Sequence, residues 1–178
     1  MSNEIIIRCA ELDDAPHIAQ LVADGGSDAH LNPALGVDEA YIEQCRQDEL
    51  SATSIAKWHE KIRHNDTDQH VIVALNGLRS IIGMHYSRVH DAEHGSIIGI
   101  YINRDYRNGG TDGAAQRLTD NALAWLGPHR TINTMIATYN VASQRFHRRN
   151  GFVIPGEMRT MGRIPTQLWF RPPQPGER

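Results

Sequence analysis

Residues 96–126 have the sequence SIIGIYINRDYRNGGTDGAAQRLTDNALAWL, in which one hydrophobic pattern gives way to another. The first part is rich in isoleucine, a β-branched residue, and such a run is typical of a buried strand. The last part repeats apolar residues at helical spacing between Ala114 and Trp125. Between the two lies RNGGTDG, residues 107–113, whose glycines tolerate positive φ. The segment therefore predicts a strand, a glycine-rich turn and a helix.

This arrangement predicts an anion-binding site at the start of the helix. A strand, a glycine-rich turn and a helix N-terminus direct several backbone N–H groups toward one point, and the helix dipole adds partial positive charge there. A phosphate group suits such a place. Neither of the two best-known phosphate-loop patterns, Gly-x-x-x-x-Gly-Lys-Ser/Thr and Gly-x-Gly-x-x-Gly, occurs in residues 107–113. A turn with a purely structural role is therefore the alternative.

Length and composition indicate an ordinary globular protein. The chain has 178 residues, and we expect one domain over residues 1–171 followed by a proline-rich tail at 172–178. No apolar run reaches membrane-spanning length and the first residues do not resemble a signal peptide, so we expect a cytoplasmic protein that does not bind membranes. The two cysteines, Cys9 and Cys45, form no Cys-x-x-Cys pattern and are expected to be free thiols.

Charge is distributed unevenly along the chain. Residues 1–66 contain 13 acidic and 5 basic side chains, whereas residues 67–178 contain 8 acidic and 13 basic ones. The second part could favour an anionic ligand and the first a cationic one, although the charges could also lie only on solvated faces. Nucleic acid is not expected as a partner, because the chain has no dense Lys/Arg run and no zinc-finger spacing.

The remaining patterns predict alternating strands and helices. Strands are expected at residues 4–9, 70–75, 79–89, 131–138, 152–154 and 167–170, and helices from Asp13 or Asp14 to Gly25-Gly26 and at residues 37–47, 52–64 and 140–150. The strand that begins near Ser96 is joined to the strand at 131–138 through a helix, which implies that this pair is parallel. The chain is therefore expected to form a mixed α/β sheet with helices on both faces.

Two segments together resemble the GNAT superfamily of acetyl-CoA-dependent N-acetyltransferases. IYINRDYRNGG, residues 100–110, resembles the family's strand followed by Arg/Gln-x-x-Gly-x-Gly/Ala. NVASQRFHRRNGF, residues 140–152, resembles its Asn-x-x-Ala…Tyr-x-x-x-Gly-Phe helix. The resemblance extends over residues 4–171. It implies a GNAT-like fold, with a mostly antiparallel sheet of six to seven strands, and transfer of an acetyl group from acetyl-CoA to a primary amine of a small molecule by direct attack in a ternary complex.

The resemblance also implies a set of cofactor-binding residues. The matching positions are Ile100, Tyr101, Ile102, Arg107, Asn108, Gly109, Gly110, Thr111, Gly113, Asn140 and Ser143. One departure from the family pattern concerns Asp112, which falls where a small residue is usual. Its carboxylate at the helix N-terminus would repel a diphosphate. Either a one-residue insertion lets Gly113 take the small position, or Asp112 caps the helix.

A second departure affects catalysis. His147 occupies the position of the family's general-acid tyrosine, which protonates the departing thiolate; histidine could serve instead. The alternative is an exposed helix histidine whose pKa is lowered by Arg148 and Arg149. Three further residues are catalytic candidates, of which Glu93 is the first choice as base, although charges in a hairpin turn are often only solvated. These candidates are Glu93, Ser96 and Tyr139.

The sequence leaves two further questions open. Three histidines on a predicted hairpin, His85, His90 and His94, suggest a metal, but they have no recognised ligand spacing, so we expect no metal site. The alternative to an enzyme is a non-catalytic module that binds acyl-CoA or regulates a partner. The expected partners are a small-molecule amine and, in a homodimer, a second copy of the chain.

Overall fold

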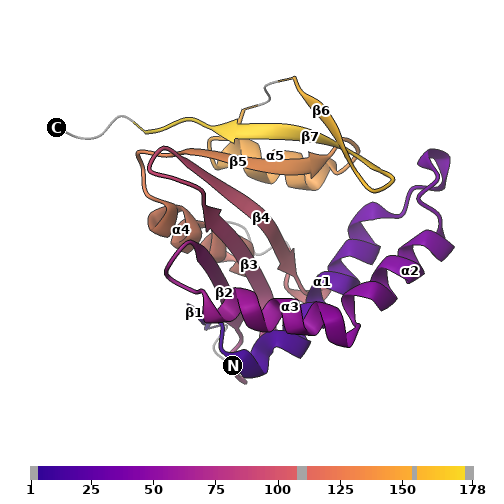
Figure 1. Ribbon diagram of the computed structural model, residues 1–178, viewed down its shortest axis with the longest axis horizontal. Helices are drawn as coiled ribbons and strands as arrows, with labels where there is room; N and C mark the ends of the chain where they lie inside the picture. Colours follow the sequence, from indigo (N-terminus) through magenta and orange to yellow (C-terminus); the bar gives the residue numbers. More distant parts are fainter. Residues whose placement is uncertain (1–3, 108–111, 154–155, 175–178) are drawn as a thin grey trace.

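A seven-stranded sheet forms the centre of the molecule, which we describe from a computed structural model covering residues 4–107, 112–153 and 156–174 (Figure 1). The strands are β1 (Ile6–Cys9), β2 (Gln69–Leu75), β3 (Ile81–Val89), β4 (His94–Ile102), β5 (Thr131–Ala137), β6 (Met158–Met161) and β7 (Ile164–Arg171). The α-helices are α1 (Ala15–His30), α2 (Glu39–Glu49), α3 (Ala52–Arg63), α4 (Ala114–Leu126) and α5 (Val141–Arg149).

The strand order is β1-β2-β3-β4-β5-β7-β6, and neighbouring strands are antiparallel except for β4 and β5. The parallel pair follows from the connection through α4, which carries the chain back to the starting edge before β5 begins. The predicted fold class, a mixed and mostly antiparallel α/β sheet with helices on both faces, is confirmed.

The two faces of β2 and β3 carry separate hydrophobic clusters. On one face, Val73 and Met84 pack with residues of α1 and α3, including the almost fully buried Trp58. On the other face, Ile72 and Leu118 belong to a cluster that contains α4. Because side chains alternate between faces along a strand, the continuous apolar run of β2 serves both clusters.

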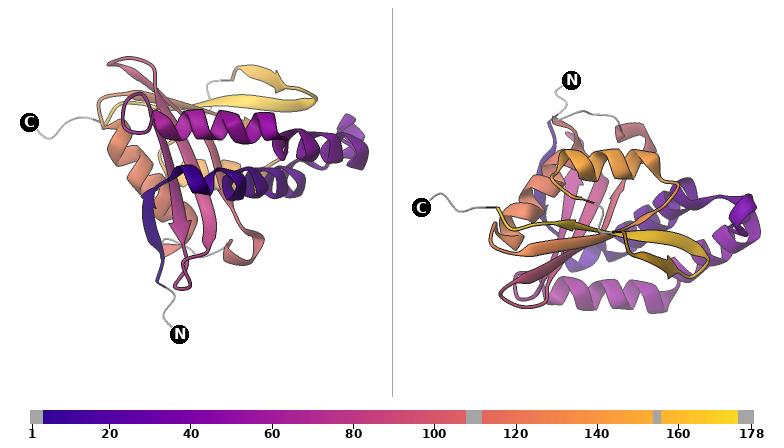
Figure 2. Two further views of the ribbon diagram at one scale, coloured as in Figure 1. Left: turned by 60° about the horizontal axis from the view of Figure 1, so that its bottom comes forward. Right: turned by 90° about the horizontal axis from the view of Figure 1, so that it is seen from above.

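The last third of the chain adds a second packing unit. Phe152, which follows helix α5, packs in one cluster with Trp169 of β7 and Leu126 of α4. Figure 2 shows α4 and α5 on one side of the sheet and α3 on the other. In the ranges that the structure describes, no helix combines the length and apolarity needed to cross a bilayer.

The predicted end of the first helix at Gly25-Gly26 is wrong. Helix α1 continues through both glycines to His30. A Cβ atom added to Gly25 would lie 2.6 Å from Cδ1 of Tyr101 on β4, whereas one added to Gly26 would have no neighbour within 4 Å. Gly25 therefore permits close contact between α1 and β4 rather than ending the helix.

The C-terminal hairpin also differs from the expectation. Strand β6 was not predicted, because all four of its residues are exposed and no alternation marks it. The strand expected at 167–170 is longer and begins at Ile164. Val153, from the short strand expected at 152–154, forms a single bridge to Phe170.

Candidate functional site

The sheet splits between β4 and β5. These strands pair only at three positions, from His94↔Thr131 to Ser96↔Asn133. Beyond them, β4 continues to Ile102 along β3, and β5 continues to Ala137 along β7. In the described part of the chain, the edge of β4 from residue 97 onward therefore has no strand partner toward β5. Backbone N–H and C=O groups on such an edge are available to an extended ligand.

A polar network closes the narrow end of this split. The Ser96 hydroxyl donates to Oδ1 of Asn133 at 2.8 Å and lies 2.7 Å from Nε2 of His90. Ser96 is buried and His90 is exposed, so the network runs from the sheet to the surface. The structure thus places this predicted catalytic residue at the point where β4 and β5 separate.

The start of α4 is open to an anion. Gly113 is the N-cap residue, with φ −72° and ψ 162°, and the first turn of the helix contains no acidic residue. Asp112 is exposed and precedes the cap, so the interpretation of Asp112 as the capping residue is wrong, whereas the alternative of a one-residue insertion depends on a turn outside the described residues. Within the described residues, no side chain caps the first N–H groups of α4, which is the condition under which a helix N-terminus can bind an anion.

The turn before α4 is only partly described. Arg107 donates from Nε to the carbonyl oxygen of Ile102 at 2.9 Å and pairs with Asp28 of α1 at 2.9 Å. Its side chain therefore ties the end of β4 to α1. The four predicted cofactor contacts that follow lie outside the described residues: Asn108, Gly109, Gly110 and Thr111.

Helix α5 begins with the predicted cap. Oδ1 of Asn140 accepts a hydrogen bond from the N–H of Ser143 at 3.0 Å. This leaves the amide NH₂ group of Asn140 able to donate to a ligand. The Ser143 hydroxyl lies 3.3 Å from Nδ1 of His147 in the next turn.

His147 is buried, which overturns the interpretation of an exposed histidine controlled by Arg148 and Arg149. Burial lowers its pKa, and the carbonyl of Ser143 acts in the opposite direction. Because a carbonyl oxygen only accepts, the contact of 2.8 Å assigns the proton of the neutral ring to Nδ1. Nε2 then carries a lone pair. A role as general acid would require the imidazolium form, which burial disfavours.

A cavity of about 290 Å³ lies beside the end of β4. Its walls come from α1, α2, β4 and the β6–β7 hairpin. The lining residues are Val22, Ala23, Gly26, Ser27, His30, Tyr41, Ile42, Cys45, Arg46, Glu49, Tyr101, Met161, Gly162 and Ile164. Most of these walls are apolar, and Glu49 supplies the only carboxylate among the lining residues. Arg46 also lines the cavity, so the side formed by α1 and α2 contributes one side chain of each charge.

Tyr101 connects the split and the cavity. Its backbone belongs to the free edge of β4, and its ring lines the cavity against Gly25. Burial and the charge of Glu49 raise the pKa of Tyr101. The Glu49 carboxylate accepts a hydrogen bond of 2.6 Å from Nε1 of Trp58, which fixes its position at the cavity wall. The two flanking residues of the predicted set, Ile100 and Ile102, pack into the α4 cluster.

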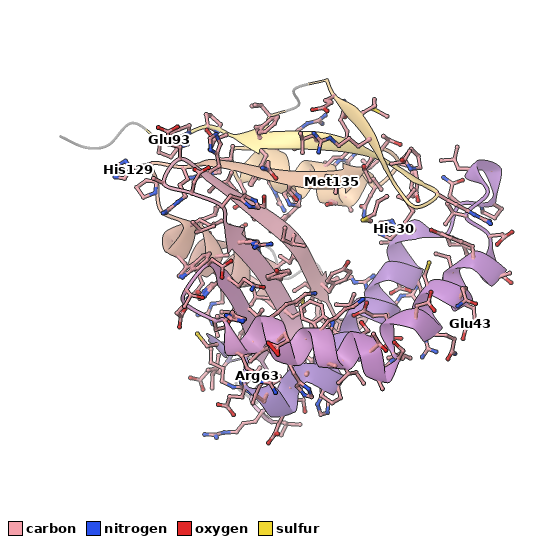
Figure 3. All side chains as sticks on the ribbon, in the orientation of Figure 1. His30, Glu43, Arg63, Glu93, His129 and Met135 are labelled. Atoms are coloured by element: carbon pink, nitrogen blue, oxygen red, sulfur yellow. The ribbon has the colours of Figure 1, made fainter. Side chains whose placement is uncertain are left out.

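Tyr139 contacts the backbone of His30, which lines the cavity. The Tyr139 hydroxyl donates to the backbone carbonyl of His30 at 3.0 Å, which joins the residue after β5 to the end of α1. Nδ1 of His30 is buried without a hydrogen-bond partner in the described part of the chain. Burial lowers the pKa of His30. Figure 3 shows His30 and Met135 labelled on the α1 and β5 sides of the site.

Glu93 lies at the closed end of the split. It occupies the exposed turn before β4, and its backbone carbonyl accepts from Thr131 N–H at 2.8 Å. Figure 3 places Glu93 near His129, at the end of the sheet away from His30. The structure does not bring Glu93 to the cavity, so its predicted role as base gains no geometric support.

The three hairpin histidines do not share one cluster of ligands. His85 contacts Ser87, His90 contacts Ser96, and His94 contacts Asp91. Within the described residues they therefore do not form the metal site that their number suggested.

Comparison with known proteins identifies the family. The model of the acetyltransferase (GNAT) domain matches residues 4–153. The chain belongs to the GNAT acetyltransferase family. A search of curated proteins found no match to this acetyltransferase.

Solved structures share the fold of this acetyltransferase at low sequence identity. PaiA N-acetyltransferase from Thermoplasma acidophilum, in complex with coenzyme A, is 17% identical, covers 93% of this chain and 98% of its own, and gives a TM-score of 0.70. A GNAT-family acetyltransferase from Streptococcus pneumoniae is 22% identical, with coverage of 94% and 98% and a TM-score of 0.67. Spermidine N-acetyltransferase from Vibrio cholerae, in complex with CoA and spermine, is 16% identical, with coverage of 95% and 95% and a TM-score of 0.66.

The described residues of this acetyltransferase fit a coenzyme A group. The free edge of β4, the start of α4 without a side-chain cap and the Asn140 amide provide hydrogen-bond donors and acceptors that such a group requires. Sequence reasoning missed the cavity residues His30, Glu49 and Tyr41. They come from helices without a recognisable motif, and only the long-range contacts between α1, α2 and β4 bring them together.

Proposed function

We propose that this acetyltransferase transfers the acetyl group of acetyl-CoA to a primary amine of a small molecule, by direct attack in a ternary complex. The observation that supports this most strongly is the position of the free β4 edge. It connects the side of the sheet near the start of α4, where we place the diphosphate, with Tyr101 in the wall of the cavity. Acetyl-CoA supplies the activated thioester, and the protein holds the amine next to it.

We infer that the acceptor is a monoamine with an apolar body. The cavity has mainly apolar walls, and Glu49 is the one carboxylate that lines it. The lining Arg46, in contrast, already pairs with Asp24 and Glu43. A carboxylate attracts an ammonium group, and a charge-assisted hydrogen bond to it positions the amine. The V. cholerae relative holds spermine, a polyamine, but a single lining carboxylate favours one cationic group here.

His30 is the base in this proposal. The amine must lose a proton before or during attack, and a neutral imidazole can accept it. Because burial lowers its pKa, His30 is neutral at physiological pH, and its buried Nδ1 has no competing partner in the described part of the chain. The thiolate requires a proton donor, and Tyr139, close to the same cavity through its bond to His30, is the candidate.

Release of free thiol from acetyl-CoA in the presence of an amine panel tests the proposal. Apolar monoamines such as phenylethylamine are expected to give faster turnover than spermidine. Glu49→Gln should raise KM for the amine at least about tenfold, because it removes a charged hydrogen-bond partner. Binding of coenzyme A should not change.

Glu43→Gln is the matched control for this experiment. Glu43 lies on the same helix, is exposed and does not line the cavity (Figure 3). We expect it to leave KM unchanged. Binding of coenzyme A without thiol release for any amine would favour the non-catalytic module instead.

A further inference from the structure

A second cluster of chemically reactive side chains lies at the β1–β2 edge of the sheet. It consists of Cys9 at the end of β1, Asp66 in the loop after α3, and His70 in β2. Cys9 Sγ, a carboxylate oxygen of Asp66 and a ring nitrogen of His70 all lie within 4.8 Å of one another. Sγ is 3.8 Å from Oδ2 of Asp66, and Nδ1 of His70 is 3.2 Å from Oδ1. Strand β3 separates this cluster from β4 and the acetyltransferase site.

These separations suit a tetrahedral zinc ion. Zinc binds sulfur at about 2.3 Å, and nitrogen or oxygen at about 2.0–2.2 Å, so tetrahedral ligands lie roughly 3.3–3.7 Å apart. The Asp66 carboxylate lies 3.8 Å from Cys9 Sγ through Oδ2 and 3.2 Å from His70 Nδ1 through Oδ1, and both distances are close to that range. Cys9 and Asp66 are exposed, so an ion can reach the cluster from solvent.

The ring of His70 is oriented as in a metal ligand. Nε2 lies 3.1 Å from Oδ1 of Asn121, an oxygen that only accepts, so Nε2 carries the proton. Nδ1 lies 3.2 Å from Oδ1 of Asp66, and in a metal-bound state it would give up any proton it donates there and direct its lone pair to the ion. Trp125 stacks on the ring with a centroid distance of 4.7 Å and an interplanar angle of 8°. Metal-binding histidines usually donate their second N–H in this way, because the bond fixes both tautomer and orientation.

The loop that carries Asp66 is fixed by hydrogen bonds. Oδ1 of Asn65 accepts from the N–H of Val71 at 2.7 Å, and Nδ2 donates to the carbonyl of the same residue at 3.0 Å. The N–H of Asp66 donates to the carbonyl of Gln69 at 2.9 Å. The carboxylate is therefore held opposite His70.

The nearest cationic side chain on β1, Arg8, does not neutralise the carboxylate of Asp66. Arg8 is adjacent to Cys9, but its guanidinium makes two hydrogen bonds to Asp14, at 2.6 and 3.0 Å. The carboxylate of Asp66 instead contacts the thiol of Cys9 and Nδ1 of His70, the two groups that would release protons to bind a cation. A divalent cation would supply the missing positive charge.

We propose that Cys9, Asp66 and His70 bind one zinc-type divalent cation, with a fourth position open to water. The ion would displace the thiol proton to solvent, and thiolate plus carboxylate would balance its charge. A thiolate and an imidazole exclude Mg²⁺ and Ca²⁺, which prefer oxygen ligands. The ion would join β1, the loop before β2 and, through Asn121, helix α4. This site is distinct from the hairpin histidines considered from the sequence.

The test uses the full chain without a histidine tag, stripped of metal by a chelator and titrated with Zn²⁺ and Co²⁺. The protein is expected to bind one equivalent of Zn²⁺ with a rise in Tm, and Co²⁺ should produce a thiolate charge-transfer band. Cys9→Ser should abolish both the band and the rise in Tm. It should also weaken Zn²⁺ binding at least about 100-fold. Cys45→Ser, which removes the other free thiol, should leave all three unchanged.

Two further variants avoid disturbing the buried ring of His70. Asp66→Asn keeps the shape of the side chain and should weaken Zn²⁺ binding at least about tenfold. Asn121→Ala removes the partner of Nε2 and should weaken binding about 10–100-fold, whereas Asn121→Asp should retain it. A chain that binds no Zn²⁺, an equal Co²⁺ band in Cys9→Ser and Cys45→Ser, or an unchanged affinity in Asp66→Asn would overturn the proposal.

Discussion

His85 lies in the middle of β3 and is fully buried. Its Nδ1 is 3.2 Å from the Ser87 hydroxyl, and Nε2 has no hydrogen-bond partner in the described part of the chain. Burial is the main cause that lowers its pKa from 6.5 to about 3, and electrostatic interactions with His147 and His70 act in the same direction. Between these values the unfolded chain takes up a proton that the folded protein does not. Folding stability must therefore decrease as the pH falls below 6.5.

The contribution of His85 to this decrease can be measured by urea denaturation. Because one pKa unit corresponds to about 1.4 kcal/mol, the residue should cost roughly 2 kcal/mol of unfolding free energy between pH 6.5 and 5. His85→Gln should lose that part of the pH dependence, whatever its stability at pH 7. His129→Gln, at an exposed position, should retain it. Equal pH dependence in both variants would contradict the assignment.

His30 makes a second prediction about pH, this time for catalysis. A base works only in its neutral form, which exists above its pKa, and burial lowers the pKa of His30 from 6.5. The profile of kcat/KM should therefore fall on the acid side with an apparent pKa below 6.5. His30→Gln should reduce kcat at least about 100-fold and remove this limb. Retention of the limb with normal kcat would show that another group accepts the proton.

At the scale of the element, the two adjacent glycines of α1 should respond oppositely to the same change. Gly26→Ala meets no neighbour, so it should stabilise the helix by about 0.5–1 kcal/mol. Gly25→Ala would push against Tyr101 and should destabilise by about 1–3 kcal/mol. Thermal and urea denaturation measure both effects. Because Tyr101 lines the cavity, Gly25→Ala should also raise KM for the amine; equal stability of the two variants would argue against the close contact.

The start of α4 allows a comparison of charge at constant shape. Aspartate and asparagine are equally good N-caps, so Gly113→Asp and Gly113→Asn should satisfy the first N–H groups similarly. Only the aspartate adds negative charge where a diphosphate would bind. Isothermal titration should show weaker coenzyme A binding in both variants and the larger loss in Gly113→Asp. Wild-type affinity in both would place the diphosphate elsewhere.

At the scale of the molecule, local patterns predicted most of the fold. Isoleucine-rich runs marked β3 and β4, and the β4–α4–β5 connection indicated the parallel pair. The helix end at Gly25 was predicted wrongly because a glycine that stops a helix and one that makes room for Tyr101 look the same in sequence. Strand β6 was missed because a fully exposed strand has no hydrophobic pattern.

The sequence predicted site residues only where they are close together along the chain. The turn and cap of α4 form one segment, so their chemistry could be inferred from neighbouring residues. The cavity instead combines residues from His30 to Ile164, and the proposed metal site joins Cys9 to Asp66 across 57 positions. Neither spacing matches a known motif. The burial that lowers the pKa of His147 likewise depends on Phe152 and the sheet beneath α5 rather than on adjacent arginines.

The short seam between β4 and β5 should also be visible in solution by hydrogen–deuterium exchange. Only three residue pairs join these strands, so the amides of residues 97–102 that face the split should take up deuterium faster than those of the fully paired β2. An extended ligand that hydrogen-bonds to this edge would slow their uptake. Deuterium uptake at this edge of β4 would therefore show whether a ligand is bound there, even when no acyl group is transferred.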